Sequence, residues 1–407
     1  MLGKSLLKIS YVGAGNILNG VLGLAFLAAV AKILDLQTFG KYALITALLV
    51  SLSRIIDFGT NSVFVAKSIS AQSDKFINAF YTTKLFLLIL SFPIIITVLF
   101  LLKLADPLII LIVILGLIAY AVNYTLYSLF QKDEKYSYLV LLNSFPAVIK
   151  GIFAALIFFK VFYPTLIQAS AVFSFSLFAC LPLIFLLPKH LRSFKLVPKE
   201  VFGLIKEAFP AGISQQIYET WPSISNAIAK ISGGFSDVGI FALASKLSHI
   251  FVLISFSIFT VLLPKNANRK KQKLSYDYSE TIMISILILL FCVLAIPAGH
   301  FILGKAFGEK FEGSIAILNI LLFSNALTSI HTFIENFFYI ESKTKYIMYI
   351  NIGKLGVFTI ACLALVSKLG IYGLAMADLI AAFLAVVFTA LIIYRSNART
   401  APGNLPL

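Results

Sequence analysis

The chain has 407 residues, of which 60% are hydrophobic and only 12% are charged, and its mean hydropathy is +0.98. Soluble domains carry roughly twice that charged fraction, so the composition excludes an ordinary soluble enzyme. A membrane-spanning helix needs about 20 apolar residues, and this apolar content is sufficient for roughly a dozen of them. The formal net charge of +16 would indicate nucleic-acid binding in a soluble protein, but here the positive-inside rule must be considered first.

Apolar stretches separated by polar breaks predict an all-α polytopic membrane protein with twelve transmembrane helices. The expected spans are residues 10–31, 42–66, 80–102, 107–129, 138–159, 165–187, 208–229, 238–262, 281–303, 314–338, 346–367 and 371–394. The longest gaps, Pro188–Lys206 and Pro264–Glu280, are too short for a separate catalytic domain. The four histidines are scattered and no catalytic constellation appears, so we expect no enzyme activity.

Lysine and arginine residues in the gaps set the expected orientation. Twenty-one of the 33 cationic residues, among them Lys84, are assigned to the side that holds both termini, and eight to the opposite side. Both termini are therefore expected in the cytoplasm. Topology and anionic lipid account for the basic gaps on that side, so the lipid bilayer is an expected partner and nucleic acid is not.

Short matches relate the two halves of the chain. Ala31-Lys32-Ile33 and the following Phe39–Leu44 read like Ala229-Lys230-Ile231 and the following Val238–Leu243. Further matches occur in the same order, each at the same helix number in its half. Six helices per half give the two halves the same topology, related by a pseudo-two-fold axis along the membrane normal.

This repeat predicts the domain organisation. An N-terminal six-helix lobe is expected at residues 1–190, a cytoplasmic linker at 191–207 and a C-terminal six-helix lobe at 208–407. In transporters built from such repeats, the substrate site lies between the halves.

Four cations, Arg54, Lys150, Lys246 and Lys354, fall inside predicted spans and on equivalent helices of the two halves. Each costs roughly 2.5–3.5 kcal/mol at the membrane centre, so such residues face a bundle interior or a watery cavity. We interpret them as a cationic lumen that binds a phosphate or diphosphate. The alternative is that carboxylates neutralise these cations in purely structural ion pairs. Arg54 and Asp57 have the i,i+3 spacing of such a pair on one helix.

Few acidic or titratable groups lie within the spans. They are Asp57, Glu219, His331, Glu335 and Asp378. His331 and Glu335 are spaced i,i+4 and can share a proton, but no third ligand accompanies them, so no metal site is expected. These groups are candidates for coupling to an ion or proton gradient, and interhelical hydrogen bonding is the alternative.

The seventh predicted span carries Pro210, Gly212 and Pro222 with polar residues between them. Proline removes a backbone donor and bends a helix, so polar groups beside a bend predict a hinge that lines a cavity. The first predicted span, its partner in the other half, has several glycines but no proline, and close helix packing is the alternative for the glycines.

The sequence resembles bacterial polysaccharide or O-antigen flippases of the Wzx type, in the multidrug/oligosaccharidyl-lipid/polysaccharide exporter (MOP) superfamily. The similar segments are Gly13–Asn16, Ala31–Leu34, Phe39–Leu44, Asp57-Phe58-Gly59, Asp237–Ala242 and Leu369–Ala375. The resemblance implies alternating access by two lobes. It also implies an undecaprenyl-diphosphate-linked oligosaccharide as substrate, as in lipopolysaccharide synthesis, moved across the bacterial inner membrane.

The resemblance also limits the alternatives. No cofactor is expected, although a proton or sodium gradient is a candidate driving force, and other polysaccharide assembly proteins are candidate partners. Drug exporters of the superfamily tend to have a proline and an acidic group within the first helix, and this helix has neither in its interior. The lipid II flippases of the superfamily usually have two further helices, which this chain is too short to hold. An ion-coupled small-molecule antiporter of the same fold remains the competing hypothesis.

Overall fold

The computed structural model describes residues 2–71, 76–133, 135–252, 278–341 and 345–398, with the single residues 266, 269, 272 and 343. These residues form helices and connecting turns, and none of them is in a β-strand. They divide into two compact units, Met1–Ala227 and Ile228–Leu407. Six of the expected cytoplasmic cations lie outside the described residues: Lys75, Lys265, Lys270, Lys271, Lys273 and Arg399. The lobe boundaries expected from the repeat stay a prediction.

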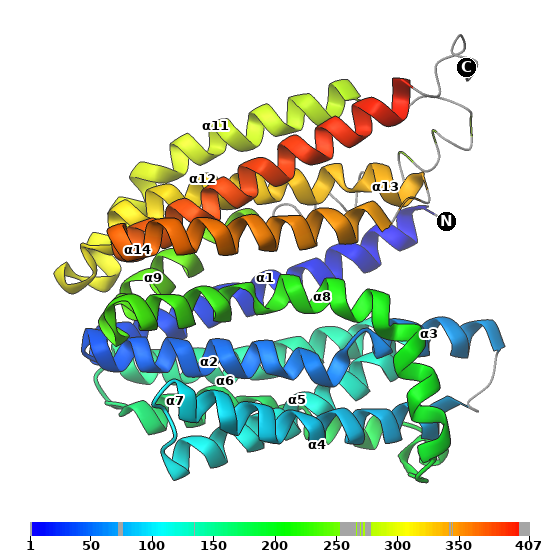
Figure 1. Ribbon diagram of the computed structural model, residues 1–407. Coiled ribbons are helices and arrows are strands. Elements are labelled where there is room, and N and C mark those ends of the chain that lie inside the picture. Colours follow the sequence, from blue (N-terminus) through cyan, green and yellow to red (C-terminus); the bar gives the residue numbers. More distant parts are fainter. Residues whose placement is uncertain are drawn as a thin grey trace. The chain divides into compact units, whose positions relative to one another are not determined.

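The first unit is a helical bundle (Figure 1). Its helices are α1 (Leu2–Ile33), α2 (Leu36–Asp57), α3 (Thr60–Ala71), α4 (Ile77–Leu101), α5 (Pro107–Lys132), α6 (Tyr136–Phe158), α7 (Leu166–Phe175) and the larger part of α8 (Pro198–Gly233). Two 3₁₀ segments, η2 (Ser176–Leu186) and η3 (Lys189–Arg192), precede α8. α1 packs along α6, whereas α2 lies against α4, α5 and α7. Most of α2 is therefore buried.

Local signals begin and end these helices. Asp35 caps α2 by accepting a hydrogen bond from the Thr38 amide at 3.0 Å. Asp106 caps α5 in the same way, with a proline at the first helical position. Between α2 and α3, Phe58 and Gly59 adopt positive φ angles of 38° and 72°. These two residues divide the expected span 42–66 into two helices.

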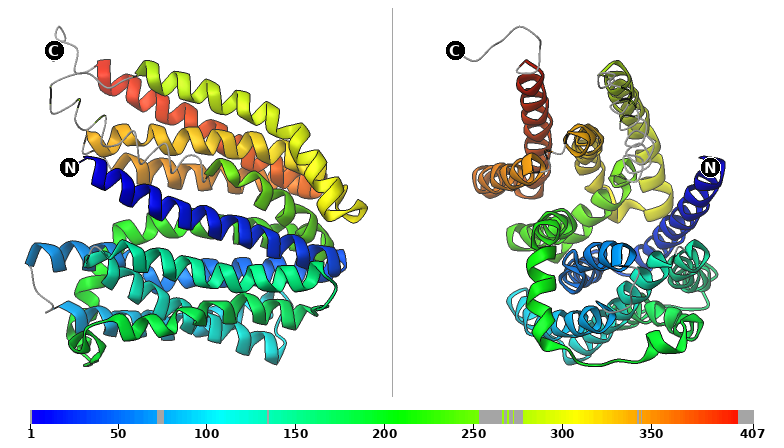
Figure 2. Two further views of the ribbon diagram at one scale, coloured as in Figure 1. Left: turned by 180° about the vertical axis from the view of Figure 1, so that it is seen from behind. Right: turned by 90° about the vertical axis from the view of Figure 1, so that its right-hand side faces the viewer.

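α8 changes direction along its length. Its first part runs across the end of the bundle of the first unit, and its remainder runs along that bundle, as Figures 1 and 2 show. The predicted span 208–229 corresponds to the second part. α8 begins ten residues earlier, at Pro198.

The second unit contains α9 (Phe235–Ser248), α11 (Tyr278–Ile302), α12 (Ser314–Ile334), α13 (Asn336–Ile340) and α14 (Lys345–Ala398). The π-helical turn η4 (Leu303–Phe307) and the 3₁₀ turn η5 (Glu309–Phe311) follow α11. α12 packs against α9, α11 and α14. α14 is two helices joined at Gly370, whose φ of 55° and ψ of −134° are non-helical. Figure 1 shows that the chain reverses direction there, from the orange arm of α14 to the red arm.

Each of the twelve predicted spans coincides with a helical segment where the structure describes it, and residues 253–262 of the span 238–262 lie outside the described residues. In those parts, nine helices are both long and apolar enough to cross a membrane, with the two arms of α14 counted as one. The chain is therefore an all-α multi-pass membrane protein.

Burial supports the internal repeat. At a shift of 199 residues, Phe39–Ile45 in α2 corresponds to Val238–Ala244 in α9. The two heptapeptides have the same pattern of burial at all seven positions, with only Lys41 and Ile240 half-buried. The matched sequences therefore have equivalent environments in their own units.

Candidate functional site

Arg54 of α2 is paired with a carboxylate inside the first unit. Its Nη2 atom lies 3.1 Å from Oε1 of Glu219 in α8, and each side chain is about one-quarter exposed, at 26% and 27%. The guanidinium carbon lies 5.3 Å from the centre of the Tyr124 ring of α5. Its Nε has no hydrogen-bond partner among the described residues. Side chains of α2, α5 and α8 thus meet at the Arg54 guanidinium, and its Nε–H group has no acceptor among the described residues.

α8 packs tightly on α2 beside this ion pair. The Ser51 hydroxyl donates to the Glu219 carbonyl at 3.2 Å, and the Gln216 amide donates to the Ser51 carbonyl at 3.3 Å. A Cβ on Gly212 would lie 2.6 Å from the Phe58 carbonyl oxygen. Only glycine permits so close an approach of the two backbones. At Gly212, close helix packing is thus the observed geometry.

The hinge residues lie within a helix that is continuous from Pro198 to Gly233. Pro222 is half-buried, and the side chain of Pro210 lies outside the described side chains. A proline inside a helix favours a bend, which agrees with the changed direction of α8. Hinge motion about Pro210, Gly212 and Pro222 stays a prediction.

A second ion pair corrects the assignment of Lys84. This lysine was placed in a cytoplasmic gap, but it lies inside α4 and is only 3% exposed. Its Nζ donates to the Ile56 carbonyl at 3.1 Å and lies 3.4 Å from Oδ1 of Asp57, which is 5% exposed. The predicted span 80–102 already contained Lys84. The hydropathy pattern therefore indicates a position inside the membrane span for Lys84, in contrast to its assignment to the loop charges.

Tyrosines of α5 border the two ion pairs. Tyr120 and Tyr124 stack with their ring centres 5.6 Å apart. The Tyr124 hydroxyl lies 3.0 Å from the hydroxyl of Ser53, and the Lys84 ammonium lies 6.0 Å from the Tyr124 ring centre. The i,i+4 spacing of these tyrosines, which places them on one helix face, is the sequence signal that indicates this stack.

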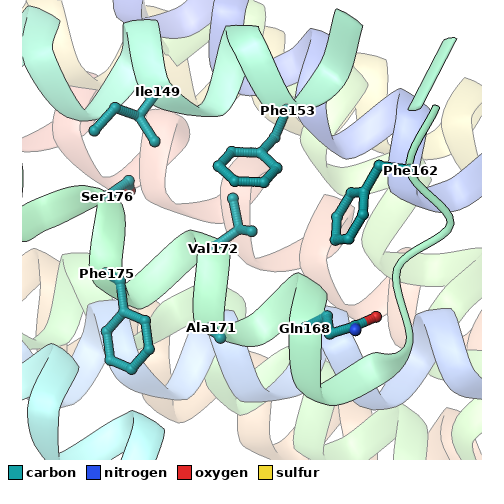
Figure 3. A pocket seen from close by; sticks show the side chains of 8 residues that line it. All are labelled: Ile149, Phe153, Phe162, Gln168, Ala171, Val172, Phe175 and Ser176. Atoms are coloured by element: carbon teal, nitrogen blue, oxygen red, sulfur yellow. The ribbon is translucent and has the colours of Figure 1, made fainter. Parts of the chain in front are cut away.

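Lys150 of α6 lies on another helix pair of the first unit, and its ammonium is 5.2 Å from the Phe173 ring centre of α7. Close by, α6, α7 and the connection between them line an open apolar pocket of about 300 Å³, drawn in Figure 3. Phe153, Phe162 and Phe175 line it, and Gln168 lies at one end. Its lining suits a hydrocarbon chain and contains no predicted site residue.

In the second unit, polar side chains follow one face of α12 opposite α14. The Lys354 ammonium donates to the Thr328 hydroxyl at 3.2 Å. The Ser324 hydroxyl donates to Asp378 Oδ2 at 2.7 Å, and Asp378 is 9% exposed. Lys354 and Asp378, from the two arms of α14, thus both bind hydroxyls of α12.

His331 and Glu335 extend this polar face. Their Nε2 and Oε1 atoms lie 3.6 Å apart, and neither atom has a hydrogen-bond partner among the described residues. Glu335 separates α12 from α13, and the adjacent Asn336 is fully buried with both amide atoms unpartnered. A helix break beside unpartnered buried polar atoms is typical of ion sites in transporters. In the parts of the chain that the structure describes, no cluster of three or more metal-ligating side chains occurs.

Lys246 lies on an exposed part of α9 within the second unit. α9 ends two residues after Lys246, at Ser248, and His249 is its C-cap. The four predicted cations are thus distributed over both units. Whether they share one cavity stays a prediction.

The comparison with protein families matches residues 5–267 to the family described as "Polysaccharide biosynthesis protein". No curated protein matches the chain.

Several solved structures share the fold. An inward-closed structure of the lipid II flippase MurJ has a TM-score of 0.79 and 17% identity, covering 94% of this chain and 87% of its own. An inward-facing multidrug resistance MATE transporter of the MOP superfamily has a TM-score of 0.71 and 14% identity, with coverages of 95% and 96%. A MOP superfamily transporter from Pyrococcus furiosus has a TM-score of 0.64 and 15% identity, with both coverages at 96%.

The family match covers well over half of the chain, and the fold is that of the MOP transporters and flippases. These relatives are transporters, in agreement with the expectation that the chain is not an enzyme. The chain is thus a multi-pass membrane protein that belongs to the polysaccharide biosynthesis protein family.

Proposed function

We propose that this protein moves an undecaprenyl-diphosphate-linked oligosaccharide across the bacterial inner membrane by alternating access. The repeat unit of O-antigen or another polysaccharide is the proposed cargo, moved from the cytoplasmic to the periplasmic leaflet. Membership of the polysaccharide biosynthesis family carries this proposal. The fold shared with a structure named as a lipid II flippase agrees with a lipid-linked substrate.

Arg54 is the residue best suited to the diphosphate. A guanidinium binds phosphate oxygens through two parallel hydrogen bonds, and its charge does not titrate in a protein. The Arg54 side chain is about one-quarter exposed and its carboxylate partner within the first unit is Glu219, whereas its Nε atom is buried without a hydrogen-bond partner among the described residues. In this mechanism the diphosphate replaces Glu219 as the partner of Arg54. After the substrate is released, Glu219 pairs with Arg54 again. The exchange limits the cost of leaving a cation unpaired within the membrane.

Lys150, Lys246 and Lys354 are the proposed further members of the cationic lumen. A lysine ammonium interacts with phosphate as a point charge without the fixed fork of arginine. Lys354 already donates to a neutral hydroxyl, Thr328, which a diphosphate oxygen can replace as acceptor. Together the four cations would lower the energy of the diphosphate at successive depths of the membrane.

An ion-coupled antiporter of the same fold is the second candidate, and the buried His331–Glu335 pair beside a helix break favours it. A buried carboxylate that exchanges a proton or sodium ion is a recurrent coupling element in transporters. Coupling is also compatible with the flippase proposal, because uphill movement of the glycolipid needs a driving force. Asp57, Glu219 and Asp378 already have cationic or hydroxyl partners in the structure. Glu335 and His331 are our leading candidates because they lie at the break between α12 and α13, beside the unpartnered buried amide of Asn336.

Mass spectrometry of lipids that remain on the purified protein tests the substrate class. We expect a polyprenyl-diphosphate glycan that is retained by the wild type and lost from Arg54→Gln. Retention of drugs or small cations without a glycolipid would contradict the flippase proposal. A flipping assay in vesicles with a purified lipid-linked oligosaccharide then tests movement itself.

A further inference from the structure

Residues 185–209 comprise the end of η2, the turn η3 and the first part of α8, and we call this segment the basic strap. It contains five lysines and arginines but only two acidic residues, Glu200 and Glu207. The cations are Lys189, Arg192, Lys195, Lys199 and Lys206, and all five are exposed. The strap therefore presents a net positive surface.

Hydrogen bonds to α4 fix the strap in place. Tyr81 Oη donates to the Leu191 carbonyl at 2.6 Å, the Lys195 amide donates to Asn78 Oδ1 at 3.0 Å, and the Val197 amide donates to Thr82 Oγ1 at 3.0 Å. Arg192 is held by its own strap, donating to the Phe185 and Leu187 carbonyls at 2.6 and 2.8 Å. The strap thus has a defined conformation, and its lysines are presented on a rigid support.

The strap has one buried apolar face and one exposed apolar face. Leu187, Leu191 and Leu204 are buried in the core of the first unit. On the outside, however, Phe185 is 74% exposed and Phe202 is 77% exposed. Phe194, Leu196 and Phe209 are also exposed. So many large apolar side chains on a surface connection indicate contact with something other than water.

The helical part of the strap is amphipathic. Val201, Leu204 and Ala208 are buried, whereas Phe202 and Lys206 share an exposed face at i,i+4 spacing. This part of α8 runs across the end of the bundle of the first unit (Figures 1 and 2). Since the bundle helices span the membrane, a helix across their ends lies along the membrane surface. Aromatic and basic residues on one face are typical of helices that lie in the headgroup region.

We infer that the basic strap binds the headgroups of anionic phospholipids. Lysine ammonium groups contact the phosphates, and the exposed phenylalanines enter the upper part of the acyl region. The lysine-rich charge favours an anionic over a zwitterionic headgroup. The strap thereby fixes the depth of the α8 end of the first unit in one leaflet, independently of the substrate in the lumen.

Native mass spectrometry of the full chain, released from mixed phosphatidylglycerol and phosphatidylcholine nanodiscs, tests this inference. We expect the wild type to retain phosphatidylglycerol selectively. The variant Lys189→Gln/Lys195→Gln/Lys199→Gln should lose about a hundredfold of that affinity, since each cation near an anionic surface contributes about fivefold. The matched control is Lys103→Gln/Lys160→Gln/Lys305→Gln, which removes three exposed lysines outside the strap and should keep selectivity. Equal losses in the two variants would overturn the inference.

A fluorescence experiment tests insertion separately. Phe202→Trp in a Trp221→Phe background places the reporter on the exposed face of the strap. Brominated phosphatidylglycerol should quench it strongly, and brominated phosphatidylcholine should quench it less. An unquenched reporter would overturn the inference. Binding of a soluble protein to the strap, without any preference for anionic lipid, would also overturn it. Neither readout depends on glycolipid transport, so failure here leaves the proposed function standing.

Discussion

Arg54 and Glu219 come from helices that are far apart in the sequence, yet their Nη2 and Oε1 atoms lie 3.1 Å apart within the first unit. Each side chain is about one-quarter exposed, so solvent screens the pair and its contribution to stability is small. The charge is therefore available for exchange with another anion. This property distinguishes it from the deeply buried Asp57–Lys84 pair beside it.

The first prediction concerns this exchangeable cation. Arg54→Gln should lower the flipping rate at least tenfold, because a charge-assisted hydrogen bond contributes about 1.5–3 kcal/mol and 1.4 kcal/mol corresponds to a factor of ten. Glu219→Gln keeps the cation and should reduce flipping less. The charge swap Arg54→Glu/Glu219→Arg controls for pairing alone. Restored flipping in the swap would show that the pair acts structurally and not as a substrate ligand.

The second prediction concerns the buried pair. Lys84→Met leaves Asp57 uncompensated in a site where both residues are almost fully buried, so we expect a loss of about 3–5 kcal/mol in unfolding free energy. Thermal unfolding in detergent measures the effect. Asp57→Asn/Lys84→Met should recover most of the loss, whereas Lys103→Gln, at an exposed position, should have little effect. An undiminished melting temperature in Lys84→Met would contradict the structural role.

Sequence patterns predicted the spans well because hydropathy is a local property. The break at Gly370 was expected between spans 346–367 and 371–394, and the structure has it there. The break at Phe58 was not expected, because an apolar residue in a left-handed conformation has no local signal. Its neighbour Gly59 supplied only a weak one.

The partners of the charged residues were harder to predict. Spacing along one helix suggested Asp57 as a neutralising partner of Arg54, but the carboxylate 3.1 Å away belongs to α8. Which helices pack together depends on the whole bundle and cannot be derived from i,i+3 spacing. The His331–Glu335 pair was expected from its i,i+4 spacing, since both residues lie on one helix face.

The third prediction uses two glycines of α8. Gly212→Ala should destabilise the first unit by about 1–3 kcal/mol, because its Cβ would lie 2.6 Å from the backbone oxygen of Phe58. Gly203→Ala is the matched control, since nothing lies within 4 Å of its Cβ. That substitution should be neutral or stabilising by about 0.4–1 kcal/mol. Equal melting temperatures for the two variants would contradict the close packing of α8 on α2.

The fourth prediction concerns the start of α2. Hydrogen bonds from Thr38 lower the pKa of Asp35 below its model-compound value of 3.8. A carboxyl group with a lowered folded-state pKa stabilises the protein above the unfolded-state pKa, and this contribution is lost as the pH falls through the folded-state value. Asp35→Ala should therefore cost about 1 kcal/mol at pH 7. The difference from wild type should shrink below pH 4. Asp35→Asn keeps a capping acceptor, so a full loss in that variant would contradict the capping role.

The fifth prediction separates coupling from structure in the second unit. Glu335→Gln preserves the shape of the side chain but removes its ability to exchange a proton, at a helix break where Oε1 has no hydrogen-bond partner among the described residues. If the pair couples transport to a gradient, the variant should still retain glycolipid but lose the response of flipping to an imposed pH or sodium gradient. Glu309→Gln, an exposed position in the same unit, is the control and should respond like the wild type. A Glu335→Gln protein that responds normally to both gradients would assign the His331–Glu335 pair to helix packing, and coupling would then have to reside in Asp57, Glu219 or Asp378.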